Sequence, residues 1–201
     1  MPDGVVTWAD LTADVRAQVD VDDLTALGWL VDCARIMNAE AGWNLNVSTY
    51  TGDGNENAFT TYPCVRIEAV LVDNQPYRRR TLSQMDAAVA GGSSRQIYAE
   101  LAGAFPAVLV NPTPRSGGAI EVRWIEDVAY PDDPTTQTPG FPSDLVSCLA
   151  DGAIATGLAR MDERFDSAGY FQARFTDATT RLKHRRNSRV GRGPVPIRLV
   201  T

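Results

Sequence analysis

The chain has 201 residues, of which 44% are apolar and 22% are charged, values typical of a soluble globular domain with a sizeable core. No uncharged apolar run approaches the roughly 18 residues that a membrane-spanning helix needs, so none is predicted. The first residues lack the basic stretch and apolar segment of a cleaved signal peptide, which argues against secretion by that route.

The charge is distributed unevenly along the chain. The formal net charge of −6 comes from 25 acidic and 19 basic side chains. No Asp or Glu follows Asp177, and residues 1–177 have 12 basic and 25 acidic side chains, a net charge of −13. The last 24 residues carry seven basic side chains, namely Arg181, Lys183, Arg185, Arg186, Arg189, Arg192 and Arg198. We therefore expect an acidic body and a basic C-terminal segment that meet different partners.

Two helices are predicted at the start of the chain. Residues 7–19 place apolar side chains at helical spacing behind Thr7, which is a good N-cap. A longer apolar stripe runs from Asp23 to Ala41, and Gly42 supplies a stop signal. Residues 1–42 are thus predicted to form an αα-hairpin.

Residues 43–131 are rich in β-branched and aromatic side chains, Gly, Asn and Pro. A capping box between Thr81 and Gln84 begins one short helix, which ends at Gly91. Because no helix is long enough for repeated βαβ crossovers, we expect an antiparallel sheet or small sandwich. The predicted strands are 44–50, 64–72, 95–99, 107–110 and 119–130.

Residues 132–184 complete the helical part of the predicted fold. A Pro-rich connector over 131–142 precedes a helix at 143–164, capped by Ser143, and a second helix that ends near Lys183. Gly152 and Gly157 each cost about 1 kcal/mol in a helix relative to Ala, which predicts a close approach of another helix.

The predicted fold class is therefore α+β. Residues 1–42 and 132–184 form a helical bundle from both chain ends, and residues 43–131 insert an antiparallel β-sheet. Residues 185–201 form an extended basic C-terminal tail, which cannot build a packed core alone.

No motif predicts a catalytic, cofactor or metal site. His184 is the single histidine, and Cys33, Cys64 and Cys148 lack metal-ligand spacing, so free buried thiols are expected. The acidic turn at 53–57 resembles the start of a calcium loop but lacks the Gly and Glu that such a loop needs further on. We predict that the protein is not an enzyme.

The seven basic C-terminal residues are the candidate binding residues. One interpretation is the binding of nucleic-acid phosphates, although no interleaved aromatic residues are present to stack on bases. Another is docking into an acidic groove of a protein partner, with ordering on contact. A third is a solvated end without a partner.

Several stretches, taken in order, match one known layout. They are the helical opening that ends at 41–42, VRIEAVLVDNQPY at 65–77, TLSQMD at 81–86, a strand with Tyr98, FPAVLVNPTP at 105–114, IEVRWIEDV at 120–128, FPSDLVSCLADGAIATGLAR at 141–160, and a helix with Tyr170, Phe171 and Phe175. This layout, over roughly residues 20–182, resembles the head-to-tail adaptor (connector) proteins of tailed bacteriophages. Asn74 stands where Gly is usual in that family, and Phe141–Pro142 stands where Leu-Pro is usual.

The resemblance implies a structural, non-enzymatic virion protein that is made in the host cytoplasm and needs no cofactor, metal or membrane. Its implied partners are further copies of itself in a dodecameric ring, the portal protein above, and the next neck or tail protein below. DNA would pass through the ring without sequence-specific binding, past a lining to which the acidic body could contribute. We assign the seven basic residues to portal docking as a hypothesis.

Two other function classes remain open from the residues. A small nucleic-acid-binding protein that uses the Arg-rich C-terminal arm would show steeply salt-dependent DNA binding as a monomer. An enzyme or sugar-binding module would show a pocket with convergent polar groups. The four tryptophans, Trp8, Trp29, Trp43 and Trp124, could serve such a module, but their positions favour core or interface roles.

Overall fold

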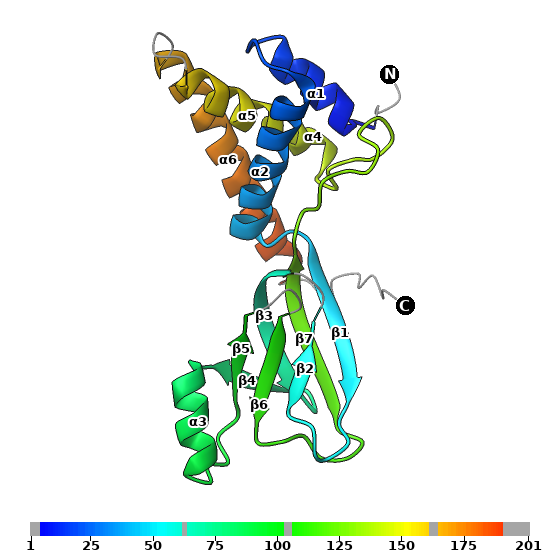
Figure 1. The fold of residues 1–201 in the computed structure, drawn as a ribbon, viewed down its shortest axis with the longest axis vertical. Helices are drawn as coiled ribbons and strands as arrows, with labels where there is room; N and C mark the ends of the chain where they lie inside the picture. The colour runs from blue at the N-terminus through cyan, green and yellow to red at the C-terminus, as the bar shows by residue number, and fades with distance from the viewer. Residues whose placement is uncertain (1–4, 62–63, 103–105, 161–164, 191–201) are drawn as a thin grey trace. The chain divides into compact units, whose positions relative to one another are not determined.

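The structure is a computed structural model that describes residues 5–61, 64–102, 106–160 and 165–190. The described residues form two compact units (Figure 1). The helical unit comprises those within Met1–Trp43 and Val128–Gly193, and the sheet unit comprises those within Asn44–Asp127. The predicted α+β class is confirmed.

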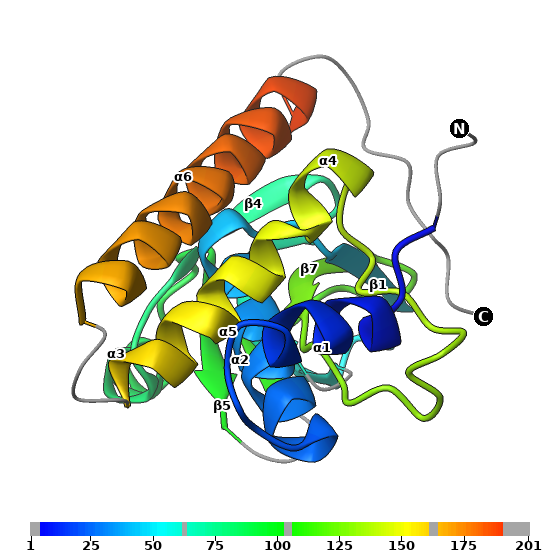
Figure 2. The same ribbon diagram turned by 90° about the horizontal axis from the view of Figure 1, so that it is seen from above.

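Helices from both ends of the chain build the helical unit. They are α1 (Trp8–Arg16), α2 (Asp23–Ala41), the single turn α4 (Ser143–Val146), α5 (Cys148–Ala159) and α6 (Phe165–Val190). Helix α5 packs against α1, α2 and α6, as Figures 1 and 2 show, and nearly all of its side chains are buried. A helix that is apolar on every side belongs in the centre of its unit.

Helix α2 begins and ends where the sequence predicts, and α1 begins behind the predicted cap Thr7 but ends at Arg16 rather than at residue 19. The backbone N–H of Asp10 donates to the Thr7 hydroxyl at 3.2 Å, and the Asp10 carboxylate accepts from the Thr7 N–H at 2.9 Å, which completes a capping box. Asp22 caps α2, and Gly42 ends it with a left-handed φ of 63°. Both helices therefore have partners for terminal N–H and C=O groups that would otherwise lack them.

The two glycines of α5 confirm the predicted close approach. A Cβ on Gly152 would lie 2.8 Å from the Cys33 sulfur and 2.9 Å from the Phe175 ring. A Cβ on Gly157 would lie 2.7 Å from the Trp29 ring. The absence of side chains at these two positions is what allows α2 and α6 to pack so closely on α5.

The C-terminal helices differ from the prediction in three places. Pro142, rather than Ser143, is the N-cap of α4, and the helix predicted over 143–164 is divided at Ser147 and ends at Ala159. Helix α6 continues to Val190, so residues 185–190, predicted to be extended, are helical. Arginine and lysine are good helix formers, and their charge is favourable near a helix C-terminus. Residues 191–201 lie outside the described residues.

The Pro-rich connector over 131–142 forms no strand, as predicted. Its backbone instead meets the first turn of α1. The N–H of Trp8 donates to the carbonyl of Gln137 at 3.2 Å, and the N–H of Ala9 donates to the carbonyl of Pro134 at 2.8 Å. Both N–H groups lie in the first turn of a helix, where no intrahelical acceptor exists.

The sheet unit holds a seven-stranded sheet in the order β1-β7-β3-β4-β5-β6-β2. Its elements are β1 (Leu45–Thr51), β2 (Ala58–Thr60), β3 (Cys64–Val72), β4 (Gln75–Arg79), α3 (Leu82–Ala90), β5 (Ile97–Leu101), β6 (Ala107–Asn111) and β7 (Ala119–Glu126). Strands β2 and β4 were not predicted, and β7 ends earlier than the predicted 119–130.

The prediction that the sheet is fully antiparallel is wrong for one pair of strands. Strands β4 and β5 are parallel, with Arg78 opposite Ile97 and Arg79 opposite Tyr98, whereas the other neighbouring pairs are antiparallel. The nine-residue helix α3 connects them and lies beside β5 and β6 (Figure 1). One short helix is therefore enough for a single crossover, although it could not support a repeated βαβ pattern.

A two-residue turn joins β3 to β4. Asp73 and Asn74 have positive φ values of 49° and 63°, and Val72 pairs with Gln75 across the turn. This geometry is that of a type I′ hairpin. The Asp73 carboxylate accepts a hydrogen bond from the N–H of Ala119 at 2.9 Å.

Buried side chains of the sheet unit form two clusters. The larger includes Val108, Ile120, Val122 and Trp124. The smaller lies under α3, where Met85 is the buried residue of that helix and packs with Ile97 and Ala99. Of the four tryptophans, Trp8, Trp29 and Trp124 are buried, and Trp43 packs partly buried against the helical core.

Candidate functional site

The basic residues proposed for docking lie on the last turns of α6 where they are described. Arg181, Lys183, Arg185 and Arg186 are helical. The side chain of Arg189, and Arg192 and Arg198 as a whole, lie outside the described residues.

Two of these arginines bind carboxylates of their own unit. Arg185 forms a two-pronged contact with Asp144, with N–O distances of 2.8 and 2.5 Å, which joins the end of α6 to α4. The hydrogen bond from Arg185 lowers the pKa of Asp144, and the same contact raises the pKa of Arg185. Arg181 pairs with Asp177 one turn earlier at 2.6 Å.

Arg186 is placed against the end of α2. A Cβ on Gly42 would lie 2.6 Å from Nη1 of Arg186, so a larger residue there would displace this guanidinium. Lys183 is exposed, and no acidic side chain among the described residues pairs with it. The four described basic residues are therefore not equivalent, because three of them are engaged within the helical unit.

A second basic cluster lies in the sheet unit, and the sequence reasoning missed it. Side chains alternate between the two faces of a strand, so Arg78 and Arg80 share a face and Arg79 points to the other. Arg79 pairs with Glu100 at 2.9 Å, and burial raises the pKa of that carboxyl. The run of three arginines at 78–80 is the feature of the sequence that could have indicated this cluster.

Arg78 and Arg80 line a groove of about 1090 Å³ together with Arg95, which precedes β5. Its walls come from β4, α3 and the segment that leads into β5. No acidic residue lines it, and its other lining residues are Pro76, Gln84, Ala87, Ala88, Gly91, Ser93, Gln96 and Ile97. The groove therefore offers positive charge beside a partly apolar surface, and we call it the arginine groove.

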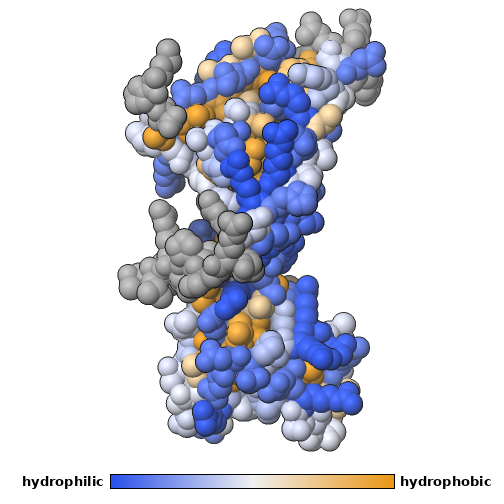
Figure 3. Space-filling view, turned by 180° about the vertical axis from the view of Figure 1, so that it is seen from behind, coloured by the Kyte–Doolittle hydropathy of each residue, from blue (hydrophilic) through white to orange (hydrophobic). Residues whose placement is uncertain are grey.

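On the face of each unit that Figure 3 shows, the coloured residues are mainly hydrophilic, with apolar areas between them. Among the described residues, the most exposed large apolar side chains of the helical unit include Leu24, Tyr170 and Val5, with exposed fractions of 74%, 61% and 73%. Leu24 stands at the start of α2, directly after the acidic residues Asp22 and Asp23.

The buried ionisable groups have structural surroundings. Asp151 in the helical core pairs with Arg174 at 3.3 Å, and burial raises the pKa of its carboxyl. Burial also raises the pKa of the Cys33 thiol to about 12. The prediction of buried free thiols holds for Cys33, whereas Cys64 and Cys148 are free but only partly buried.

The structure also shows the surroundings of the other residues that the sequence analysis considered as possible ligands. The Asp53 carboxylate accepts hydrogen bonds from the N–H groups of Asn55 and Glu56, each at 2.7 Å, which fits a turn. His184 is exposed on α6. Within the described ranges, no group of three or more His, Cys, Asp or Glu side chains could hold a metal ion. No helix in the same ranges is both long and apolar enough to cross a membrane.

A comparison with models of known protein families identifies a family for this chain. The family model of the SU10 adaptor protein matches residues 6–198, which include every helix and strand described above. A comparison with curated proteins finds no match. Because the family model covers nearly the whole chain, the chain belongs to the SU10 adaptor protein family, and it is a structural adaptor of the bacteriophage virion that interacts with other head or tail proteins.

Proposed function

We propose that copies of this protein form a dodecameric ring between the portal protein and the next neck or tail component, and that viral DNA passes through it. The observation that carries the proposal is the match of the phage adaptor family over residues 6–198. A closed ring needs two different, complementary surfaces on each copy. The acidic helical unit and the sheet unit with its arginine groove supply two such surfaces.

The C-terminal segment is proposed to dock on the portal. Arg181 and Arg185 already bind carboxylates within the helical unit, and Arg186 lies against Gly42. Docking would therefore depend chiefly on Lys183 and on the last three arginines of the sequence, Arg189, Arg192 and Arg198.

The ring is tested by mixing the full chain with purified portal protein and measuring the mass of the assembly by native mass spectrometry. We expect a closed ring of this chain on the portal. A monomeric chain that never associates with portal would contradict the proposal. Steeply salt-dependent binding of duplex DNA by the monomer would instead support the nucleic-acid-binding alternative.

The docking role of the tail is tested by deleting residues 191–201. The deletion leaves α6 and its ion pair to Asp144 intact, so the chain should fold with an unchanged helical content by circular dichroism. We expect association with portal to weaken, because the deletion removes Arg192 and Arg198, two of the four residues on which docking is proposed to depend. Undiminished assembly would contradict portal docking by this segment.

A further inference from the structure

We propose that the arginine groove binds the loop Asp20–Leu24 of a second copy of this chain, which we call the acidic loop. The inference rests on the proposed ring, because it names one contact through which neighbouring copies would join. The groove belongs to the sheet unit and the loop to the helical unit. The contact is thus heterologous, the kind that a cyclic ring requires.

The three arginines of the groove differ from the other described arginines of the sheet unit. Arg78, Arg80 and Arg95 are exposed, and no acidic side chain among the described residues pairs with any of them. The other described arginines of the sheet unit all pair with a carboxylate: Arg66 with Glu68, Arg79 with Glu100, Arg115 with Asp73 and Arg123 with Glu121. Three positive charges without a counter-charge therefore face one groove in an acidic chain.

The backbone fixes the spacing of these charges. Arg78 and Arg80 lie two residues apart on and just after β4, so they project from one face. Parallel pairing places Arg78 opposite Ile97, and the Arg78 N–H donates to the Gln96 carbonyl at 3.0 Å, which brings Arg95 alongside. The sheet thus holds the three side chains together before any partner arrives.

The shape and lining of the groove favour a peptide over a nucleic acid. At about 1090 Å³ it lies near the upper end of the roughly 300–1,000 Å³ typical of small-molecule sites, and it is large enough for several residues of a chain. Ala87, Ala88 and Ile97 add apolar contacts. Among the described residues none that lines the groove is aromatic, so these residues offer no platform on which bases could stack.

The acidic loop offers the complementary chemistry. Residues 1–43 contain eight acidic side chains and two arginines, a net charge of −6. The loop carries Asp20, Asp22 and Asp23, followed by Leu24, whose side chain is 74% exposed. An acidic segment that ends in an exposed leucine matches a groove that combines three arginines with an apolar wall.

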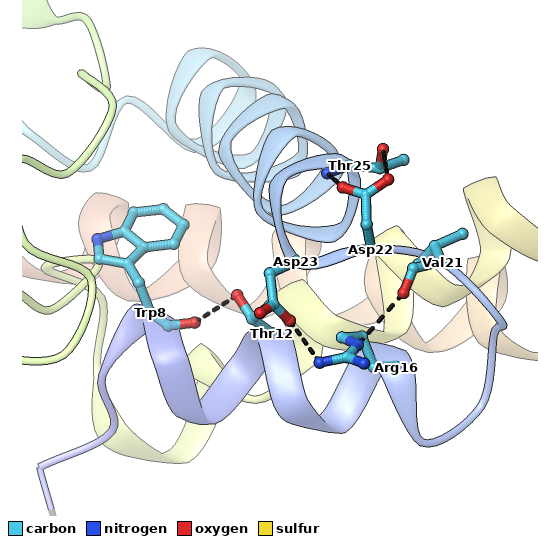
Figure 4. A network of polar contacts seen from close by, with 7 residues as sticks. All are labelled: Trp8, Thr12, Arg16, Val21, Asp22, Asp23 and Thr25. Atoms are coloured by element: carbon cyan, nitrogen blue, oxygen red, sulfur yellow. Dashed lines mark hydrogen bonds and ion pairs between the residues drawn. The ribbon is translucent and has the colours of Figure 1, made fainter.

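The loop is also held in one shape. Figure 4 shows Arg16 reaching across to it: the Arg16 guanidinium donates to the Val21 carbonyl at 3.2 Å and to the Asp23 carboxylate at 2.6 Å. Asp22 accepts from the Thr25 N–H at 2.8 Å. A preorganised loop loses little conformational entropy when it docks.

Charge reversal on each side tests the contact. The full chain would carry R78E/R80E/R95E in the groove, D20R/D23R in the loop, or all five substitutions together. Self-association, measured by analytical ultracentrifugation at low salt, should weaken about tenfold or more in each partial variant, because like charges then oppose each other. The five-substitution chain should recover most of the wild-type association, because the charges are again opposite.

A conservative variant controls for folding and for charge alone. R78K/R80K/R95K keeps three positive charges in the groove, and we expect its self-association to remain within a few-fold of wild type. All substituted side chains are exposed, so circular dichroism should show unchanged helical content, and D20R alone is the control that keeps the Arg16–Asp23 ion pair. A five-substitution chain that associates no better than the partial variants, while each folds, would overturn the contact.

A second measurement is independent of ring formation. A fluorescent peptide of residues 18–27 should bind the full chain, and it should lose affinity for R78E/R80E/R95E and when its three aspartates become asparagine. If wild type and groove variant form equal rings on portal and neither binds the peptide, this inference fails while the proposed function stands. If the chain forms no ring on portal but the peptide and charge-swap results hold, the proposed function fails and the contact stands. Duplex DNA that binds the groove in place of the peptide would also overturn the inference.

Discussion

The arginines of the helical unit and those of the sheet unit differ in whether they pair with carboxylates. In the helical unit, Arg174 binds buried Asp151, and Arg185 at the end of α6 binds Asp144. In the sheet unit, four arginines pair with carboxylates, but those of the arginine groove do not. A basic residue is free to attract a partner only where its own unit offers no counter-charge. Counting charges along the chain therefore does not show which of its basic residues are already paired within their own unit.

The cores of the two units also differ. The helical unit has one continuous cluster around α5, whereas the sheet unit has a larger cluster and a small one under α3. Helix α3 buries only Met85 among its residues. The wall of the arginine groove is therefore held by far fewer apolar contacts than the centre of the helical unit.

The largest loss of stability is expected from a substitution in the continuous core of the helical unit. Leu149 is fully buried in α5, and Leu149→Ala should lower the free energy of unfolding by about 3–5 kcal/mol, from lost transfer energy and a residual cavity. Met85→Ala should cost about 2 kcal/mol, because α3 can settle onto the sheet. Urea denaturation measures both.

Hydrogen exchange separates these two variants further. Met85→Ala should speed amide exchange within Leu82–Ala90 while leaving α5 protected. Val89→Ala is the control on the same helix, because Val89 is 54% exposed and its loss should change stability by less than about 0.5 kcal/mol. A larger cost for Met85→Ala than for Leu149→Ala would refute the ranking of the two cores.

The next effect concerns the close approach at α5. Gly152→Ala should lower stability by about 1–3 kcal/mol, because the new Cβ would meet Cys33 and Phe175 at under 3 Å, and this outweighs the gain in helix propensity. Gly169→Ala on α6 should do the opposite and raise the unfolding free energy by up to about 1 kcal/mol, since nothing lies within 4 Å of its Cβ position. Thermal or urea unfolding of the pair decides the matter, and the same sign for both would be inconsistent with this packing.

The fold was predictable where the signal lies in neighbouring residues. Capping residues and apolar spacing predicted α2 as Asp23–Ala41 and α3 as Leu82–Ala90, and alternation predicted β3 as Cys64–Val72. Strand β4 was missed because Pro76 and three arginines surround its one buried residue, Tyr77. Its neighbours in the sheet, rather than its own residues, make it a strand.

The candidate site was predictable only in part, for the same reason. Asp144 and Arg185 are 41 residues apart, and no local pattern indicates that they pair. Arg95 joins Arg78 and Arg80 only because β4 and β5 are parallel, a pairing that the sequence did not predict. The family was predictable from the order of its stretches, and the match over residues 6–198 confirms that resemblance.

Within the helical unit, two carboxylates should respond to pH with opposite signs. Burial raises the folded-state pKa of Asp151 above its ordinary value of 3.8, so its stabilising contribution is greatest below that value and is lost as pH rises through the folded pKa. The stability of wild type relative to Asp151→Asn should therefore fall between acidic and neutral pH. Urea denaturation across this range measures it.

Asp144 is the matched control for Asp151. Its pKa is lowered by Arg185, so its contribution is present above 3.8 and is lost as pH falls through the folded pKa. The stability of wild type relative to Asp144→Asn should thus rise toward neutral pH, by a small amount because the pair is exposed and screened by salt. If the stability of wild type relative to each variant changed with pH in the same direction, the burial of Asp151 and the pairing of Asp144 with Arg185 could not both be correct.

The smallest effect compares a turn of the sheet unit with a helix end of the helical unit. Asn74 and Gly42 have the same φ of 63°, but one residue carries a side chain and the other does not. At Gly42 a Cβ would add the strain of a left-handed backbone and would also displace the Arg186 guanidinium. Asn74 is exposed, and Asn tolerates left-handed backbone better than other side chains do.

Asn74→Gly should therefore raise the unfolding free energy by no more than about 0.5 kcal/mol, since relief of strain is offset by the greater entropy of glycine in the unfolded chain. Asn74→Val should lower it by about 1–2 kcal/mol, because a β-branched residue fits this region poorly. Urea denaturation of both variants measures the difference. A gain well above that bound for Asn74→Gly would mean that this asparagine, which replaces the family's usual glycine, holds the turn under real strain.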